Sequence, residues 1–397
     1  MTTVTTRTQV AVIGAGPAGL CTANLLRQRG VDCVVLEARS REFIERHPRA
    51  GFLEEWAVRE LERYGLAERL LQLAGRHGSF EFRFDARRHQ VRYAELTGQH
   101  HFVYPQQELV TDLVAQYADA LGGDIRFEVD DVRLHDLTTD RPSVTYTDAN
   151  TGQRHRVECA YLAGCDGARG VSRRHLPAGE HVVASREYGI GWLALLVEAP
   201  PSADGVVFGL HPRGFAAHMA RTPQVTRFYL QCPPGDDTAN WSHERVWREL
   251  HARLAVPGAP ISEGRIIERQ VLGMHNYVVE PMSHGRLHLA GDSAHLVAPI
   301  GAKGMNLALN DAFALSEALT ARLRDGDERG LAEYSARCLR RVWQYQEFSQ
   351  WFADVLHGAT HPDPFQARTA EARLRRLLDS PSAATAFCEL YIGKLTD

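Results

Sequence analysis

A glycine-rich turn at residues 14–19, Gly-Ala-Gly-Pro-Ala-Gly, constrains the fold of this chain more than any other feature. The short apolar run at 9–13 before it is typical of a buried parallel strand, and residues 18–28 continue as a helix with an apolar face. A second apolar run at 31–36 ends in Glu37. This is a βαβ unit, in which the glycines let the backbone approach a pyrophosphate and the acid suits a ribose hydroxyl. The motif predicts a dinucleotide site and does not choose between FAD and NAD.

A second glycine-rich segment, at residues 291–306, lies near the other end of the chain. It begins with Gly291-Asp292 and continues into Gly-Ala-Lys-Gly at 301–304, which opens a helix. An acid there can hold a ribityl hydroxyl, and the positive end of the helix dipole can face an electron-rich ring. Together with the first turn, this segment predicts FAD lying across the chain.

A third motif, Cys165-Asp166-Gly167, is followed by Arg169 and Arg173. Two arginines four residues apart share one face of a helix, where they can receive a phosphate. The alternative is a tight turn with an exposed aspartate.

Composition excludes several classes of protein. The chain has 397 residues, enough for two or three domains, with 44% hydrophobic and 24% charged residues and a net charge of −4. We therefore expect no nucleic-acid partner, and no apolar run approaches the roughly 18 residues of a membrane span. The amino terminus lacks a secretory pattern, and the seven cysteines form no CxxC pair, so we expect a cytoplasmic protein with reduced thiols. No HExxH spacing occurs, and we interpret the pair at 100–101 as solvated histidines, which predicts no metal site.

Hydrophobic periodicity predicts the remaining elements. Expected helices cover 52–64, 107–121, 304–324 and 329–357, and expected strands cover 80–84 (half-exposed), 125–128, 143–147, 191–197, 206–210, 215–221 and 225–232. The predicted class is α/β (α+β). A Rossmann-like FAD-binding domain spans 1–180, an inserted and mostly antiparallel β substrate domain spans 181–284, and a FAD-contacting segment with a carboxyl-terminal helical interface region spans 285–397.

In their order and spacing, the three motifs resemble the FAD-dependent aromatic hydroxylases, the class A flavoprotein monooxygenases. Residues 211–215, 279–287 and 301–306 narrow the resemblance to the 4-hydroxybenzoate 3-monooxygenase family, over about residues 9 to 393. The resemblance implies a monooxygenase that uses FAD, NADPH or NADH, and O2. The family hydroxylates a small aromatic acid through a flavin C4a-hydroperoxide, and the resemblance also implies a homodimer.

The same resemblance implies the cofactor residues. These are Gly14, Gly16, Ala18, Gly19, Glu37, His47, Arg49, Gln106, Asp166, Arg173, Asp292, Lys303, Met305 and Asn306. Arg49 matches a residue placed for the pyrophosphates of FAD and NADPH. Two family arginines are Ala38 and His47 here, and Arg39 and Arg41 are either their replacements at a 2′-phosphate or solvated charges. The choice between NADPH and NADH stays open.

Strand alternation predicts a hairpin that presents two arginines. Ala217, Met219 and Arg221 fall on one face of a strand, Arg227 and Tyr229 fall on one face of the next, and the residues between them are turn-like. An arginine on an exposed strand is usually only solvated. The resemblance instead implies that Arg221 grips the substrate carboxylate bidentately, Tyr229 is its hydrogen-bonding neighbour, and Arg227 lies close to the flavin.

Further catalytic residues follow from the resemblance alone. It implies that Tyr391 and His77 belong to a network that takes the proton from the substrate phenol, and that Pro299 and Asn306 lie at the flavin. Without the resemblance, Tyr391 would be interpreted as a packed tail residue and His77 as a surface helix terminus.

The substrate pocket departs from the family pattern at four positions. The family tyrosine that contacts the phenol oxygen is Phe208, the carboxylate-binding serine is Met219, a threonine at the flavin edge is Ile300, and a large aliphatic residue is Ala217. We therefore prefer a ring-substituted 4-hydroxybenzoate, such as 3-amino-4-hydroxybenzoate hydroxylated at carbon 2. Plain 4-hydroxybenzoate, giving 3,4-dihydroxybenzoate, is the alternative. More distant alternatives are a flavin dehydrogenase or oxidase and a non-catalytic flavin-binding protein.

Overall fold

The predicted βαβ unit forms the centre of a parallel sheet in the computed structural model, which describes residues 3–47 and 51–394. The sheet has six strands in the order β19 (Ser283–His284), β20 (Leu287–Leu289), β13 (Tyr161–Gly164), β2 (Val10–Ile13), β3 (Cys33–Leu36) and β9 (Asp124–Arg126). All neighbours pair in parallel except β19 with β20. Because β20 pairs with β13, the second half of the chain completes the sheet that the first half begins, and this brings the three predicted motifs to one edge.

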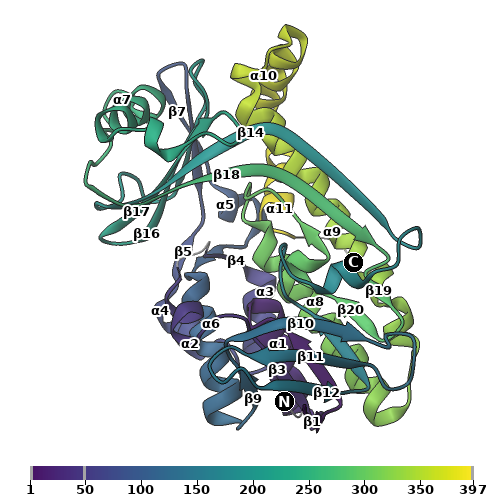
Figure 1. Cartoon of the computed structure of the whole chain (residues 1–397). Helices are drawn as coiled ribbons and strands as arrows, with labels where there is room; N and C mark the ends of the chain where they lie inside the picture. Colours follow the sequence, from purple (N-terminus) through teal and green to yellow (C-terminus); the bar gives the residue numbers. More distant parts are fainter. Residues whose placement is uncertain (1–2, 48–50, 395–397) are drawn as a thin grey trace.

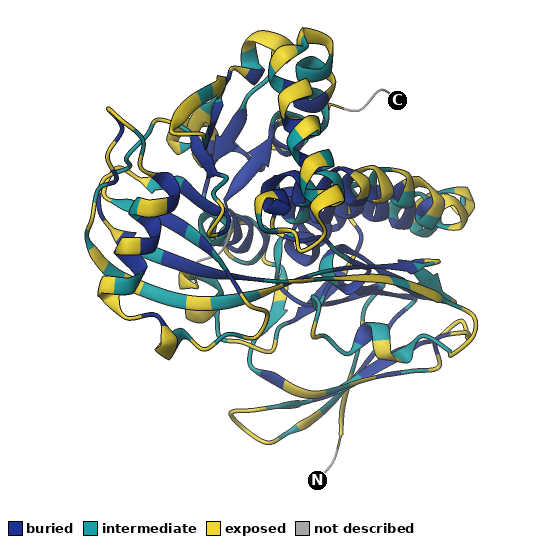
Figure 2. Ribbon diagram, turned by 90° about the horizontal axis from the view of Figure 1, so that it is seen from above, coloured by how far each residue is buried: buried dark blue, intermediate teal, exposed yellow. Residues whose placement is uncertain are grey.

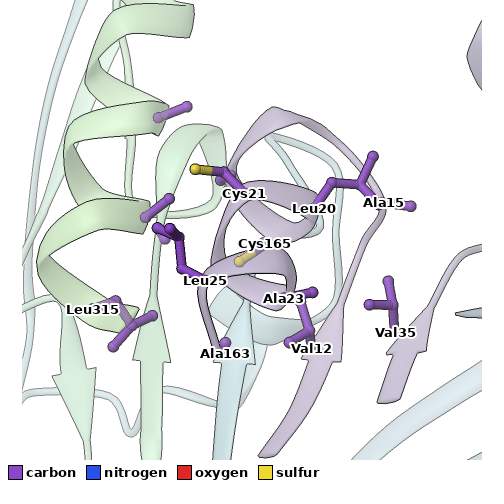
Figure 3. Close-up of a cluster of buried hydrophobic side chains, with 14 of the residues drawn as sticks. Val12, Ala15, Leu20, Cys21, Ala23, Leu25, Val35, Ala163, Cys165 and Leu315 are labelled. Atoms are coloured by element: carbon purple, nitrogen blue, oxygen red, sulfur yellow. The ribbon is translucent and has the colours of Figure 1, made fainter. Parts of the chain in front are cut away.

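Two helices pack together on this sheet. Helix α1 (Pro17–Gln28) follows β2, and α8 (Lys303–Thr320) lies beside it. Figure 3 shows their apolar side chains meeting those of the strands, with Leu25 and Leu315 on the helices and Val12 and Ala163 below them. All four are fully buried, so the two motif-bearing helices are anchored in one core.

Smaller elements surround this domain. A four-stranded sheet has the order β1 (Val4–Arg7), β12 (Arg154–Glu158), β11 (Ser143–Asp148) and β10 (Val129–His135), and a three-stranded sheet has the order β4 (Phe52–Glu54), β8 (His101–Val103) and β5 (Gly75–His77). The helices here are α2 (Arg41–Arg46), α3 (Glu55–Arg63), α4 (Glu68–Leu73), α5 (Tyr93–Thr97) and α6 (Gln106–Val114), and a π-helical segment at 115–120 extends α6.

An eight-stranded sheet forms the second large body (Figure 1). Its order is β21 (His295–Leu296), β18 (Arg265–Glu280), β14 (Val182–Glu198), β17 (Val225–Cys232), β16 (Ala216–Thr222), β15 (Val206–Gly209), β6 (Phe80–Phe84) and β7 (Arg87–Val91). It is antiparallel except where β15 meets β6. The strand predicted as half-exposed, β6, is instead almost wholly buried, because it lies between β15 and β7. The sheet thus recruits residues 80–91 from outside the predicted range 181–284.

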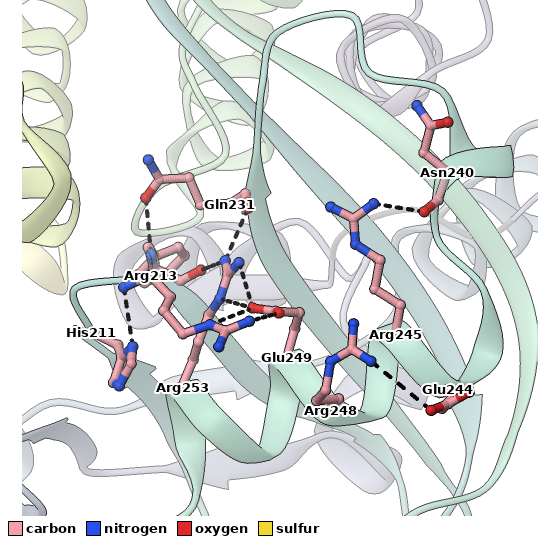
Figure 4. Close-up of polar contacts among 10 residues, drawn as sticks. His211, Arg213, Gln231, Asn240, Glu244, Arg245, Arg248, Glu249 and Arg253 are labelled. Carbon is pink, nitrogen blue, oxygen red and sulfur yellow. Dashed lines mark hydrogen bonds and ion pairs between the residues drawn. The ribbon is translucent and has the colours of Figure 1, made fainter.

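Helix α7 (His243–Leu254) covers one face of this sheet and was not expected among the strands. Its Glu249 accepts hydrogen bonds from Arg213 and from Arg253, and Arg253 donates to the backbone oxygen of Gln231 at 2.9 Å (Figure 4). The buried carboxylate is therefore paired on both sides, which satisfies the condition for burying it.

The carboxyl-terminal third is helical, as predicted. Helix α9 (Arg329–His357) has the bounds that periodicity gave, and α10 (Pro364–Asp379) and α11 (Pro381–Tyr391) return the chain to the core. Figure 2 shows the buried residues gathered where helices and sheets meet. All seven cysteines are buried and free. Within the described residues, no helix combines the length and apolar character needed to cross a membrane.

Candidate active site

The three glycines of the first turn have different neighbours. A Cβ atom at Gly14, where φ is +103°, would lie 2.4 Å from the backbone oxygen of Cys165, and one at Gly19 would lie 2.0 Å from that of Gly14. A Cβ at Gly16 would meet nothing within 4 Å. The first and third glycines are therefore required for packing, whereas the second faces open space at the start of α1. There the first backbone N–H groups have no partner within the helix, which is the cradle that a pyrophosphate needs.

Glu37 closes this turn from the end of β3. Its carboxylate accepts the backbone N–H of Ala15 at 2.7 Å and that of Arg39 at 2.8 Å. Two bonds leave a carboxylate with further acceptor capacity, which fits a ribose hydroxyl beside the turn.

The Gly291–Asp292 turn of the second motif is anchored by a buried pair, Asp311 and His295. Asp311 accepts the backbone N–H of Gly291 at 2.8 Å and lies 2.6 Å from Nε2 of His295. Burial alone would lower the pKa of His295, but the Asp311 carboxylate raises it above its ordinary value. This pair fixes the turn that carries Asp292, whose backbone oxygen accepts the hydroxyl of Tyr277.

The third motif meets the second at the ring of Tyr277. The Arg173 guanidinium lies 4.2 Å from that ring, and Asp166 accepts three hydrogen bonds from Val171 and Ser172 through one oxygen. The other Asp166 oxygen and Nη1 of Arg173 are buried without a partner among the described residues. Two orphaned polar atoms on neighbouring residues fit a polar cofactor such as FAD.

The arginine pair expected on one helix face is not formed. Arg169 is exposed in a turn, and residues 172–175 form a single 3₁₀ turn, so only Arg173 faces the motifs. The chain turns here because Asp166 binds the backbone N–H groups that follow it.

The side chain of Lys303, predicted as a cofactor residue, is bound within the protein. Its Nζ is fully buried and lies 2.5 Å from Glu54 and 2.8 Å from each of the backbone oxygens of Leu390 and Tyr391. Burial lowers the pKa of Lys303, and Glu54 opposes this shift. Three acceptors use all three ammonium hydrogens, so only the backbone of Lys303 remains for FAD.

The side chain of Asn306, predicted as a catalytic and cofactor residue, is likewise hydrogen-bonded within the protein. Its amide nitrogen donates to the backbone oxygens of Phe52 and Ala302, and its amide oxygen accepts the N–H of Glu54 at 2.9 Å. It therefore ties β4 to the start of α8. Met305 is almost completely buried beside it.

The remaining predicted cofactor residues that the structure describes lie on different helices. His47 is exposed at the end of α2, Gln106 is the first residue of α6, and Ala18 lies in the first turn of α1; Arg49 falls outside the described residues. Arg41 is bound to Asp119 and Glu45. Of the two candidate replacement arginines, Arg39 alone is left for a 2′-phosphate.

The predicted hairpin is present and brings together the residues that were predicted to bind substrate. Strands β16 and β17 pair Ala217 with Tyr229 and Met219 with Arg227, and β15 pairs Phe208 with Ala217. Directly paired residues share one face of a sheet. Arg221 lies at the end of this row, where the register shifts between positions 220 and 222, and such a bulge re-aims a side chain.

The electrostatics at the hairpin favour an anion. Burial and the neighbouring Arg227 guanidinium lower the pKa of Arg221 to about 10. Glu268 lies 3.8 Å from Arg227, with Tyr229 nearby. Two guanidinium groups beside this one carboxylate form a site that attracts a carboxylate ligand.

An apolar cluster adjoins the arginines. It contains Phe208, Ala217, Ile300 and Tyr391, and Met219 and Tyr229 pack against it. The ring of Phe208 lies 5.2 Å from that of Phe352 and 5.8 Å from that of Phe82. Pro299 is exposed beside Ile300. Residues from β15, β16, β17, α11 and the 291–306 segment thus meet, which the sequence alone did not show.

The surroundings of His77 differ from the expectation for a surface helix terminus. His77 ends strand β5 and pairs directly with His101 of β8. His101, interpreted above as solvated, is 1% exposed. Strand β8 has only three residues, all of them buried, which is too short for hydrophobic periodicity to reveal it.

A surface depression lies elsewhere. It has a volume of about 370 Å³, is lined by residues of β14, β18, α9 and α10, and includes none of the predicted site residues that the structure describes. We therefore do not assign the substrate to it.

Comparisons with known proteins agree with this geometry. Residues 7–349 match the FAD binding domain family. The chain is 36% identical over 391 residues to p-hydroxybenzoate hydroxylase of Acinetobacter baylyi, covering 98% of this chain and 96% of that protein.

Solved structures share the fold. The p-nitrophenol 4-monooxygenase from Pseudomonas putida superimposes with a TM-score of 0.82 at 22% identity, over 99% of this chain and 100% of that one. An aklavinone-11 hydroxylase, solved with FAD and aklavinone, gives a TM-score of 0.73 at 22% identity, over 88% of this chain and 69% of that one. At such identity these two likenesses establish the fold alone.

Proposed function

Because the chain belongs to the p-hydroxybenzoate hydroxylase family of FAD-dependent aromatic hydroxylases, we propose that its substrate is a 4-hydroxybenzoate-type acid. The preferred candidate carries a further ring substituent, as in 3-amino-4-hydroxybenzoate, with oxygen entering at carbon 2. Unsubstituted 4-hydroxybenzoate is the alternative. Bound FAD, reduced by NAD(P)H, supplies the activation of O2 for oxygen insertion.

The single observation that carries the proposal is the cationic hairpin beside an aromatic-lined cluster. Arg221 and Arg227 supply the charge, and Tyr229 supplies a hydroxyl at the same end. A bidentate guanidinium orients a carboxylate as well as binding it. The ring of an aromatic acid held there would extend along the row towards Phe208.

The row also supports the preference for a substituted ring. Ala217 stands between Phe208 and Tyr229, so a small side chain separates two large ones. This leaves room on one side of the ring for a substituent. Phe208 has no hydroxyl that could contact the substrate phenol and help it to ionise. An electron-donating amino group on the substrate would make the ring more nucleophilic and so offset part of that loss.

We further propose a separate role for each charged or polar group of the site. Glu37, Asp292 and the α1 turn hold FAD, Arg221 orients the carboxylate, and the Tyr391 hydroxyl receives the phenol proton and passes it towards His77. The Gly291–Asp292 turn and the residues around Ile300 keep the flavin and the ring adjacent. A homodimer is proposed from family membership only.

Product analysis with a substrate panel tests the substrate. The FAD-loaded protein is given NAD(P)H and O2 with 3-amino-4-hydroxybenzoate, 4-hydroxybenzoate or 4-nitrophenol, and hydroxylated product and peroxide are measured separately. We expect coupled product from the amino compound and little from 4-nitrophenol, which lacks the carboxylate. Efficient, coupled hydroxylation of 4-hydroxybenzoate with none of the amino compound would overturn the preference.

The arginine assignment has its own test. Arg221→Gln should raise KM for the acid at least tenfold, about 1.4 kcal/mol, while the FAD content stays unchanged. The exposed Arg248→Gln on α7 is the matched control. An unchanged KM in Arg221→Gln would refute carboxylate binding at the hairpin.

A further inference from the structure

A row of polar side chains crosses the small sheet β4–β8–β5, next to the apolar cluster that contains Phe208 and Tyr391. Glu54, His101 and His77 are direct partners across the three strands, so their side chains lie on one face. The ring of Phe52 contacts both histidines, with centroids 5.5 Å from His77 and 5.7 Å from His101. A histidine row inside a core is costly unless each nitrogen has a partner.

Two nitrogen atoms in this row have no partner in the part of the chain that the structure describes. Nε2 of His101 and Nδ1 of His77 are both buried without a hydrogen bond there. His101 is 1% exposed, and its ring stands edge-on to the ring of Tyr391 with centroids 5.1 Å apart. The orphaned nitrogens therefore lie on the same face as the residue proposed to receive the phenol proton.

Tyr93 determines the tautomer of His101. The Tyr93 hydroxyl donates its single hydrogen to the backbone oxygen of His77 at 2.6 Å, so its oxygen accepts from Nδ1 of His101 at 3.3 Å. With its hydrogen on Nδ1, His101 presents the lone pair of Nε2 as an acceptor. This arrangement assigns the unpartnered nitrogen as the basic one.

The charges around His101 keep it neutral. The titratable and charged groups that face it are His77 on β5, Tyr93 on α5, Tyr391 on α11, and Lys303 on α8 with its partner Glu54 on β4. Burial, and after it the charge of Lys303, lower the pKa of His101 well below its ordinary value. Burial also lowers the pKa of His77, which is only partly covered.

We propose that His101, oriented by Tyr93, is a positioning residue that holds one water molecule between Tyr391 and His77 in the proton route. The water donates to Nε2 of His101 and to Nδ1 of His77 and accepts from the Tyr391 hydroxyl. Three polar partners are what a buried water needs. This inference rests on the proposed function, because it assumes a phenolic substrate above Tyr391.

The proton balance needs no redox partner. The substrate O–H bond breaks as the Tyr391 oxygen accepts that proton and releases its own to the water. The water passes a proton to Nδ1 of His77, and His77 releases one from its other nitrogen to solvent. His101 stays neutral throughout and only orients the water, and the phenolate stays in the site.

The test measures phenol ionisation directly. A bound 4-hydroxybenzoate or its 3-amino derivative changes its ultraviolet absorbance when the phenol ionises, so rapid mixing gives the rate and a pH series gives the bound phenol pKa. His101→Leu should slow ionisation at least tenfold and lower kcat, while KM and binding of plain benzoate stay within about twofold. His101→Gln, which can donate to Tyr93 and accept from water, should restore most of the rate.

Further variants separate the relay from packing. Tyr93→Phe removes one hydroxyl, keeps the ring and should slow ionisation in the same direction as His101→Leu. Tyr117→Phe is the matched control, because it removes a buried hydroxyl bonded to the Cys33 backbone oxygen at 2.7 Å in the other core. If His101→Leu fails to fold, a wild-type ionisation rate in Tyr93→Phe would overturn the relay, because that variant removes the acceptor that orients His101.

The two proposals fail differently. If the wild-type protein forms no phenolate with either acid, the proposed substrate class is wrong. If the wild-type protein forms phenolate and His101→Leu does so at the same rate, the substrate class stands and the role of His101 is refuted.

Discussion

Lys303→Met should be among the most destabilising single substitutions in this chain. The Lys303 ammonium and the Glu54 carboxylate are both completely buried, and Glu54 also accepts Trp56 and Tyr345. Removing the lysine leaves a charged carboxylate in the core and strips the last backbone oxygens of α11 of their donor. Breaking a buried pair on one side costs about 3–5 kcal/mol. We expect a loss of that size in the free energy of unfolding.

The other lysine provides a matched control. Lys394 is 42% exposed and lies 3.7 Å from Glu389, so Lys394→Met should cost less than about 1 kcal/mol. Urea unfolding followed by circular dichroism would compare both variants with the wild-type protein at one saturating FAD concentration, because bound FAD raises apparent stability. Equal, small losses in the two variants would refute the reasoning about burial.

A double variant identifies the source of the loss. Glu54→Gln removes the negative charge but keeps an oxygen for Trp56 and Tyr345, so Lys303→Met with Glu54→Gln leaves no unpaired charge. The double variant should be more stable than the sum of the two single losses by about 1–3 kcal/mol. Additive losses would mean that lost packing, rather than charge, causes the effect.

Further predictions concern the cofactor turns, the pocket and pH. Gly16→Ala should fold normally but weaken FAD affinity at least tenfold, about 1.4 kcal/mol, as measured by flavin fluorescence, since its Cβ would enter the open space of the turn. Asp311→Asn should cost about 2 kcal/mol of stability and release FAD more readily, because the Gly291 N–H loses a charged acceptor. Phe208→Tyr should raise kcat/KM for plain 4-hydroxybenzoate about tenfold in steady-state assays. Burial lowers the pKa of His288 to about 4, so the unfolded state binds more protons between about pH 6.5 and 4. The contribution of His288 to the unfolding free energy should therefore fall by up to about 3 kcal/mol as pH falls through that window, and His288→Gln should make the pH dependence shallower by that share in urea titrations at several pH values, while the other buried histidines keep theirs.

Much of the fold was predictable because its signals are local. The glycine turn between two apolar runs predicted α1 and its flanking strands, and the long amphipathic stretch predicted α9 with its bounds. The hairpin β16–β17 followed from alternation around turn residues. Each of these depends on contacts between residues near in sequence or on one strongly periodic face.

Errors arose where pairing is long-range. β6 appeared half-exposed because its phenylalanines alternate with Glu81 and Arg83, yet those two charges are buried against each other. α7 was missed because its twelve residues are rich in charge, and only Glu249 with its arginine partners shows why that charge can face a sheet. A sequence does not show which charged residues will find partners far along the chain.

The site was predictable in kind and less so in detail, for the same reason. Lys303 and Asn306 stand in a motif that resembles a flavin site, yet their side chains bind Glu54 and the backbone around it. His101, which no motif singled out, is placed by β8 beside Tyr391. Residues within a motif can therefore hold neighbouring backbone in place, as Lys303 and Asn306 do, while a residue outside the motifs, such as His101, lies beside a predicted catalytic residue.

These two observations explain how the pocket can tolerate Phe208. Lys303 binds the backbone oxygen of Tyr391 and so fixes that tyrosine from α8, while the ring of His101 contacts it from the small sheet, where His77 is the strand partner of His101. Tyr391 is therefore held independently of position 208, and a proton route through it does not need a second tyrosine. We therefore expect the loss of the hydroxyl at 208 to change which substrates are activated most readily, rather than whether hydroxylation occurs. On the proposed function, a pocket that keeps Arg221 and Tyr391 while replacing the residues between them would retain the reaction and alter the ring that it accepts.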